Sequence, residues 1–165
     1  MAIISINNLS RLREKFKDKK IVFCSGSFDL THAGHILFFE DCKSLGDILV
    51  VMVGSDAVIK KNKGDKRPIL NEHIRMKTID SFKQIDYCFL DNLSHECKHP
   101  LDLFKKVFES LKPDFYAVNQ DGSDITYREK LAEEYNIQIK ILGRTCPNEF
   151  DNISTTKLIE KIRSL

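Results

Sequence analysis

The sequence predicts an α/β fold in which one parallel sheet is covered by helices on both faces. Two observations predict it. Short apolar segments rich in Val, Ile and Phe alternate, along the 165 residues, with longer segments whose apolar residues recur at helical spacing. The short segments are continuously apolar, which is typical of strands buried on both faces. Because this alternation builds consecutive βαβ units, we expect one domain over residues 1–165.

The individual elements follow in chain order. Five segments carry the strand pattern: residues 21–24, 47–53, 87–90, 115–118 and 137–142. Helical spacing predicts helices at residues 35–44, 71–82 (with Asn71 and Glu72 suited to its start), 101–111 and 126–135. Two flanking helices are predicted at residues 9–16 (capped by Ser5 or Asn8) and 155–162 (capped by Ser154). Residues 55–68 are Lys-rich and weakly patterned, so we predict a loop there. Together these elements predict a five-stranded, Rossmann-like sheet.

Composition excludes several classes of protein. Hydrophobic residues make up 42% and charged residues 30% of the chain, as in ordinary globular proteins. No apolar run approaches the roughly 18 residues that span a bilayer, and the first residues lack the basic start of a secretory signal, so we expect no membrane insertion and a cytoplasmic location. Five cysteines, with Cys24 inside an apolar run, fit a reducing compartment. A net charge of +2 gives no support for a nucleic-acid partner.

One group of residues raises the question of a metal. Cys88, His95, Cys97 and His99 lie close together in the sequence. They lack the paired C-x-x-C spacing of zinc sites. We therefore predict no metal site built from protein side chains.

Residues 25–35 are the candidate phosphate-binding segment. They follow the first predicted strand and lead into a helix, and ligands settle at such junctions in open α/β sheets. Gly26 lacks a Cβ, so backbone N–H groups there can approach an anion, and the helix that follows adds its partial positive end. His32 and His35 share a face at the helix start, where an imidazole N–H can donate to a phosphate oxygen.

Other roles are open for these and one further side chain. The two imidazoles can instead satisfy backbone carbonyls, or act as metal ligands, for which Asp29 is the only evident third ligand. Arg75, on the helix predicted after the Lys-rich loop, either adds positive charge to the site or pairs with Glu72.

This segment also carries a family resemblance. Residues 26–35 resemble the G-x-F-D-x-x-H-x-G-H signature of the cytidylyltransferase-like nucleotidyltransferase superfamily. The matching positions are Gly26, Phe28, Asp29, His32, Gly34 and His35. Six fixed positions within ten residues make a specific pattern. The resemblance spans about residues 20–162, so that range is the expected core of the domain.

Two later segments agree in order and place. Residues 54–68, with Lys60, Lys63 and the Arg67-Pro68 pair, resemble the loop of bacterial heptose-phosphate nucleotidyltransferases. Residues 153–157 (Ile-Ser-Thr-Thr-Lys), together with Arg144, resemble the closing motif of glycerol-3-phosphate cytidylyltransferases. Hydroxyls and free N–H groups at a helix start form an anion cradle, and an arginine makes bidentate phosphate contacts.

The resemblance implies an enzyme that transfers CMP or AMP from CTP or ATP to a sugar phosphate or polyol phosphate, releasing pyrophosphate, in the synthesis of activated precursors for surface polysaccharide or lipid. It implies Mg²⁺ bound with the triphosphate, and a homodimer. His32, His35, Lys60 and Lys63 would be catalytic. The predicted nucleotide-binding residues are Ser25, Gly26, Ser27, Phe28, Asp29, Gly34, Asp121, Arg144, Ser154, Thr155 and Thr156.

The chain departs from its relatives at residues 119–124. Heptose-phosphate enzymes carry Lys-Gly-Gly-Asp there and glycerol-3-phosphate enzymes Gly-Asp-Asp, whereas this chain has Asn-Gln-Asp-Gly-Ser-Asp. Asp121 either contacts the nucleotide or is an ordinary turn residue. The acceptor and the nucleobase stay open, with residues 146–152 as a candidate part of the base pocket. Two alternatives are an adenylyltransferase for a coenzyme precursor and a non-catalytic nucleotide-binding module.

Overall fold

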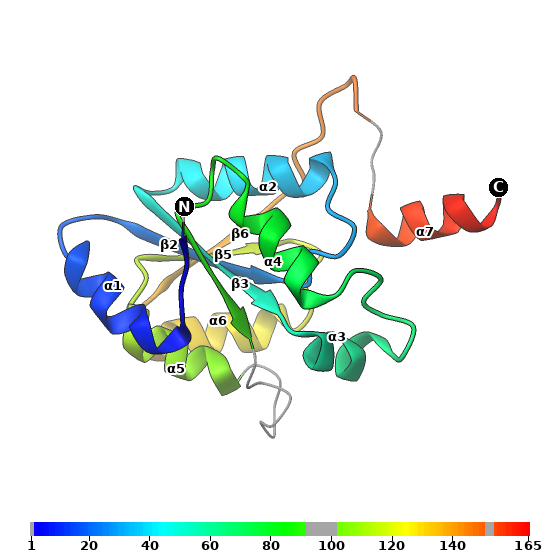
Figure 1. Ribbon diagram of the computed structural model, residues 1–165. Coiled ribbons are helices and arrows are strands. Elements are labelled where there is room, and N and C mark those ends of the chain that lie inside the picture. Colours follow the sequence, from blue (N-terminus) through cyan, green and yellow to red (C-terminus); the bar gives the residue numbers. More distant parts are fainter. Residues whose placement is uncertain (1, 92–101, 151–153) are drawn as a thin grey trace.

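A computed structural model of the chain describes residues 2–91, 102–150 and 154–165. It contains a parallel sheet in the order β1-β4-β3-β2-β5-β6 (Figure 1). The strands are β1 (Ala2–Ile3), β2 (Ile21–Gly26), β3 (Ile48–Gly54), β4 (Tyr87–Asp91), β5 (Phe115–Asn119) and β6 (Gln138–Leu142). The α/β prediction is confirmed, but the sheet has six strands and not five. The missed strand, β1, is two residues long and too short to show a pattern.

Helices cover both faces of this sheet. They are η1 (Ile6–Asn8), α1 (Leu9–Lys15), α2 (Ala33–Ser44), α3 (Asp56–Lys63), α4 (Glu72–Asp80), α5 (Asp102–Leu111), α6 (Ile125–Glu134) and α7 (Thr155–Arg163). In Figure 1, α1, α5 and α6 lie on one face, and α2 and α4 on the other. The predicted cap at Ser154 is confirmed, and Asn71, expected at a helix start, caps α4. Ser5 caps η1, and the Asn8 side chain makes no cap hydrogen bond to α1.

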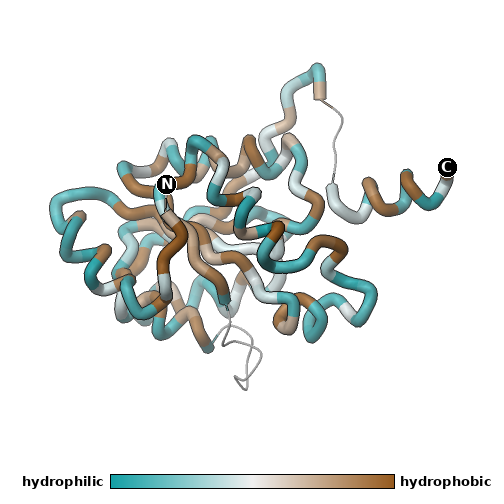
Figure 2. The backbone as a smooth tube through the Cα atoms, viewed as in Figure 1, coloured by the Kyte–Doolittle hydropathy of each residue, from teal (hydrophilic) through white to brown (hydrophobic). Residues whose placement is uncertain are grey.

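The two hydrophobic layers follow from the alternation of side chains along each strand. On β2, Phe23 faces the α1, α5 and α6 layer, while Val22 and Cys24 face the α2 and α4 layer. Figure 2 shows the apolar strands at the centre and hydrophilic residues along the outer helices. This double burial explains why the strands read as continuous apolar runs.

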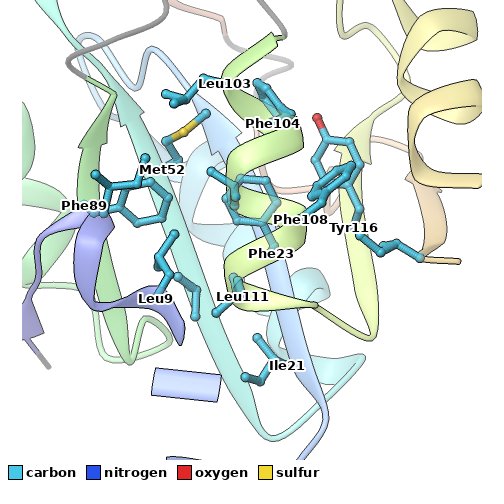
Figure 3. Close-up of a cluster of buried hydrophobic side chains, with 14 of the residues drawn as sticks. Leu9, Ile21, Phe23, Met52, Phe89, Leu103, Phe104, Phe108, Leu111 and Tyr116 are labelled. Carbon is cyan, nitrogen blue, oxygen red and sulfur yellow. The ribbon is translucent and has the colours of Figure 1, made fainter. Parts of the chain in front are cut away.

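An aromatic cluster fills the first of these layers (Figure 3). The ring of Phe23 lies 5.8 Å from Phe104, 6.1 Å from Phe108 and 5.5 Å from Tyr116, centroid to centroid. These separations lie in the range in which offset and edge-to-face ring pairs are favourable. The cluster fastens α5 against β2 and β5, the two strands whose carboxyl ends flank the site described below.

The Lys-rich segment 55–68 is not the loop that the sequence predicts. Its first half forms α3, because the Ser55 hydroxyl accepts a hydrogen bond from the Val58 N–H at 3.4 Å and caps the helix. Within this helix, Val58 and Ile59 are buried. Two apolar residues followed by a run of lysines give a weak sequence pattern, which explains the wrong prediction.

Helix α2 begins at Ala33, two residues before the predicted start, so that His32 occupies the N-cap position. Cys88 is buried within β4, while His95, Cys97 and His99 lie outside the described residues. None of the helices in the described ranges is both long enough and apolar enough to cross a membrane.

The order of the strands places a crevice beside β2. From β2 the chain moves outward through β3 to β4, and then returns to add β5 and β6 on the other side of β2. The strand order therefore reverses between β2 and β5. In open α/β sheets, ligands bind at this switch point, outside the carboxyl ends of the strands.

Candidate active site

A cavity of about 490 Å³ lies at the carboxyl ends of β2 and β5. Its lining comes from the start of α2, the end of α3, the segments after β5 and β6, and the start of α7. Of the site residues predicted from sequence, those that line it are Ser25, Gly26, Ser27, Phe28, Asp29, His32, Gly34, His35, Lys63, Asp121, Arg144, Ser154, Thr155 and Thr156. Segments more than 100 residues apart in the chain therefore meet in one place.

The two histidines lie against each other at the start of α2. Their ring centroids are 4.1 Å apart, and the His32 backbone N–H donates to Nδ1 of His35 at 3.3 Å. Because Nδ1 of His35 accepts this bond, the proton of the neutral ring sits on Nε2. The Nδ1 atom of His32 is buried and has no hydrogen-bond partner among the described residues.

Both imidazoles are held in the neutral form. Burial, followed by the neighbouring His32 and the positive Arg144, lowers the pKa of His35 to about 4. Burial and the charge of Arg144 also lower the pKa of His32. At neutral pH, His35 is therefore an uncharged N–H donor, and the positive charge of the site comes from lysine and arginine side chains.

Gly26 is needed for a reason that the sequence does not show. A Cβ at this position would lie 2.8 Å from Cζ of Phe28. The Phe28 ring therefore packs onto Gly26. The backbone of Phe28 takes a left-handed conformation with φ of 47°. The same ring lies 5.7 Å from the His35 imidazole, edge to face. Gly26 thus admits the ring that supports His35.

The Asp29 carboxylate lines the cavity but is engaged by the protein. It accepts hydrogen bonds from the backbone N–H groups of Ile69 (2.9 Å) and Leu70 (3.0 Å), and it pairs with the Arg67 guanidinium at 2.8 Å. Burial alone raises the pKa of Asp29, but these backbone and Arg67 contacts outweigh it and the pKa is lowered. This carboxylate therefore fastens the segment after α3 to the β2 end of the site.

The structure separates the two predicted catalytic lysines. Lys63, the last residue of α3, lines the cavity, where partial desolvation and then the charge of Arg67 lower its pKa. Lys60 is exposed, and its ammonium group lies 3.8 Å from the Asp65 carboxylate. Lys60 is not among the residues that line the cavity in the described part of the chain.

The start of α7 is fastened to the site by two hydroxyls. The Ser154 hydroxyl caps the helix by accepting from the Lys157 N–H at 3.2 Å. The Thr155 hydroxyl donates to the backbone carbonyl of Asp29 at 2.7 Å. Thr156 is exposed at the cavity. Two of the three predicted ligand hydroxyls thus hold the helix in place, with its N-terminal N–H groups at the cavity.

Arg144 and Asp121 form an ion pair that joins the segment after β6 to the segment after β5. The next residue, Thr145, donates its hydroxyl to the Asp41 carboxylate of α2 at 2.6 Å. Asp121 is therefore more than a turn residue. In this structure it orients an arginine at the cavity, and both residues remain partly exposed.

Arg75 is neither a ligand for the site nor a partner of Glu72. It is fully buried and donates to the backbone carbonyls of Ser27 (2.7 Å), Gly54 (2.6 Å) and Leu70 (2.9 Å). It also pairs with Asp56 at 2.7 Å. Its guanidinium therefore ties together the carboxyl ends of β2 and β3, a role that only the tertiary structure reveals.

The cavity lining also includes residues that the sequence does not mark as site residues, among them Arg67, Asn119 and Arg128. In the sequence, Arg67 stands out only as part of a family segment and Asn119 only as a departure from relatives, while Arg128 looks like any charged residue on a helix. The arginine at 128 carries no local signal, because its place depends on the contact between β5 and α6.

The described residues offer no ready-made cage for a metal. They contain no cluster of three or more histidine, cysteine, aspartate or glutamate side chains able to hold an ion. The cavity donors are instead N–H groups and cations, which suit phosphate oxygens. Such a lining fits Mg²⁺ that arrives bound to a triphosphate and keeps its waters.

Comparison with known proteins gives one family and several relatives. The family model described as cytidylyltransferase-like matches residues 23–161. The chain is similar to the bifunctional protein HldE of Helicobacter pylori strain P12, with 36% identity over 156 residues, which cover 94% of this chain and 30% of that protein. The chain thus spans about a third or less of the length of such curated relatives.

Two solved structures are similar as well. The lipopolysaccharide core biosynthesis protein from Thermoplasma volcanium GSS1 shares 30% identity, with a TM-score of 0.62, over 79% of this chain and 99% of that one. The pantoate-beta-alanine ligase from Francisella tularensis, solved in complex with beta-gamma ATP and beta-alanine, has a TM-score of 0.66 over 100% of this chain and 78% of that one. At 16% identity, the second likeness concerns the fold alone.

Proposed function

Because this chain belongs to the cytidylyltransferase-like family, we propose that it transfers a nucleotidyl group from CTP or ATP to a sugar phosphate or polyol phosphate and releases pyrophosphate. One observation carries the proposal. The neutral His35 N–H donor, the start of α2 and the cations Lys63 and Arg144 converge on a single cavity.

The chemistry requires this kind of lining. An acceptor phosphate oxygen attacks the α-phosphorus, the new P–O bond forms, and the bond to the leaving pyrophosphate breaks. Negative charge builds up on the equatorial oxygens and on the pyrophosphate. Fixed N–H donors and cations stabilise that charge, and no covalent intermediate on the protein is needed.

Each group has a role that its position supports. His32 and His35, at the start of α2, donate to the α-phosphate and to the oxygen that bridges the α- and β-phosphates. The positive end of the helix acts on the same atoms. Lys63 and Arg144, which both line the cavity, hold the departing phosphates. The start of α7 supplies further N–H groups. Mg²⁺, brought with the triphosphate, neutralises phosphate charge when bound.

The acceptor is proposed from the relatives. One solved relative is described as a lipopolysaccharide core biosynthesis protein, and the curated relatives are HldE proteins. Together with the heptose-phosphate-like segment 54–68, these favour a phosphorylated heptose as the acceptor class. A cytoplasmic location and a homodimer are part of the same proposal.

Pyrophosphate release tests the proposal. The protein is incubated with Mg²⁺ and each of CTP, ATP, GTP and UTP against a heptose phosphate, glycerol 3-phosphate and phosphopantetheine. We expect release with one nucleotide and a sugar or polyol phosphate. Release only with ATP and phosphopantetheine would establish the coenzyme-precursor alternative. Nucleotide binding without release under any pairing would leave a non-catalytic binding module.

A further inference from the structure

Arg128 brings a positive charge to the cavity wall formed by β5 and α6. Its Nε donates to the Ser123 carbonyl at 2.7 Å, and one of its terminal nitrogens donates to the Tyr116 hydroxyl. Both partners are neutral, and no carboxylate lies within ion-pair distance of this guanidinium among the described residues. The side chain is half-buried and also rests on the ring of Phe104, 5.2 Å from its centroid.

The position of this charge is fixed by the core. Tyr116 is fully buried in the aromatic cluster, and its hydroxyl also interacts with the side chain of Ser25 at the end of β2. A chain of contacts therefore runs from Ser25 through Tyr116 to Arg128. It sets the guanidinium beside the β2 end of the cavity.

A second feature of the same wall lacks a partner. The Oδ1 atom of Asn119, at the end of β5, is buried and has no hydrogen-bond partner among the described residues, although the residue lines the cavity. A buried acceptor left unpaired costs free energy, so a ligand that donates a hydrogen bond there is favoured. Hydroxyl groups of a sugar or polyol are donors of this kind.

We propose that Arg128 and Asn119 form the acceptor subsite, in which Arg128 binds the acceptor's phosphate and Asn119 accepts a hydrogen bond from one of its hydroxyls. The proposal rests on the nucleotidyl transfer proposed above and names the ligand features that the acceptor needs. At the 119–122 stretch, where heptose-phosphate enzymes carry a lysine, this chain has Asn-Gln-Asp-Gly, and the positive charge at this wall comes from Arg128 on α6.

The geometry separates this subsite from the nucleotide. Arg128 lies on the α6 side of the sheet, whereas the His32 and His35 pair lies at the start of α2, whose buried residues pack on the other face. Ser25 and Gly26 lie between the two groups, at the end of β2. An acceptor phosphate on Arg128 can therefore meet an α-phosphate held at the α2 start, and the two anions have separate cationic partners.

Binding measurements with Arg128→Met, Arg128→Lys, Asn119→Ala and Lys130→Met test the proposal. Lys130 is an exposed residue of α6, so Lys130→Met is matched to Arg128→Met in charge and helix. Each protein is first titrated with a non-hydrolysable CTP or ATP analogue. With the analogue bound, it is then titrated with a heptose phosphate or with methyl phosphate, which has no alcohol hydroxyl.

We expect Arg128→Met to weaken binding of both phosphates, by about 10- to 100-fold for the heptose phosphate, as the loss of a charge-assisted hydrogen bond predicts. Arg128→Lys should recover part of this loss. Asn119→Ala should weaken only the heptose phosphate. Binding of the triphosphate analogue should change by less than about twofold in all four variants, as should acceptor binding in Lys130→Met.

Several outcomes would overturn the proposal. The first is equal acceptor affinity in Arg128→Met and Lys130→Met. The second is a loss of triphosphate binding in Arg128→Met that equals its loss of acceptor binding. The third is an effect of Asn119→Ala that is the same for the heptose phosphate and methyl phosphate. If Arg128→Met does not fold, Arg128→Lys against wild type decides. These assays need no turnover, so wild-type protein that binds both ligands without releasing pyrophosphate would contradict the proposed function and leave this subsite standing.

Discussion

The backbone N–H of His32 donates to Nδ1 of His35 at 3.3 Å, so one histidine of the pair sets the tautomer of the other. The consequence is an Nε2–H group on a neutral ring, held at the start of α2. The bond is local, since the two residues are three apart. The neutrality is not, because it depends on burial and on the charge of Arg144.

Two substitutions of His35 distinguish the roles of its two ring nitrogens. Asn places an oxygen near Nδ1 and keeps the bond from the His32 N–H, whereas Gln places an N–H near Nε2 and keeps the donor. We expect His35→Asn to lower the pyrophosphate-release rate by about 100-fold or more, as for loss of one preorganised donor, and His35→Gln to retain more activity. Steady-state assays with the active nucleotide check this. Equal activity of His35→Asn and wild type would show that the ring is structural.

The free energy of unfolding should depend on pH because of the titration of His35. Its pKa falls from an ordinary 6.5 in the unfolded chain to about 4 in the folded protein, so between these values the unfolded state binds more protons. Stability should therefore fall as the pH drops from about 6.5 toward 4, by roughly 1 to 2 kcal/mol between pH 7 and pH 5. Urea unfolding at both pH values measures it. The fall should be smaller in His35→Asn by that amount, and an identical fall in both proteins would rule out the assignment.

Lys60 and Lys63, which both lie on α3, make a matched pair for substitution. Lys63 lines the cavity, while Lys60 is exposed beside Asp65. We expect Lys63→Met to lower kcat/KM by about 10-fold or more, because a cation near the phosphates is lost, and Lys60→Met to lower it by less than about threefold. Kinetics at fixed ionic strength decide. If Lys60→Met is the more damaged variant, α3 moves during turnover and brings Lys60 to the phosphates.

The contact between Gly26 and Phe28 predicts a coupling between two substitutions. Gly26→Ala places a Cβ 2.8 Å from Cζ of Phe28, so we expect about 1 to 3 kcal/mol of destabilisation. Phe28→Leu removes the clashing ring atom at a cost of its own. In the double variant the alanine should cost less than in the wild-type background, as a double-mutant cycle by urea unfolding would show. Strict additivity would mean that Gly26 serves the ligand and not the ring.

Sequence patterns determined the elements with a strong period. Continuous apolar runs identified β2 to β6, and the cap residues Asn71 and Ser154 marked the starts of α4 and α7. The predicted site residues other than Lys60 line the cavity, because most of them follow strands or open helices, where a parallel sheet gathers its ligand groups. Where the local signal is weak, prediction failed, as for the two residues of β1 and the lysine-rich α3.

Only the tertiary structure decided what each polar side chain of the site does. Asp29 and Arg75 have the residue types of ligands, yet packing commits the first to Arg67 and to two backbone N–H groups, and the second to three carbonyls. Lys60 and Lys63 look alike in sequence and differ in place. Sequence period specifies which face of an element is buried. The partner of a charge depends on distances between segments far apart in the chain, and those distances are set when the core packs.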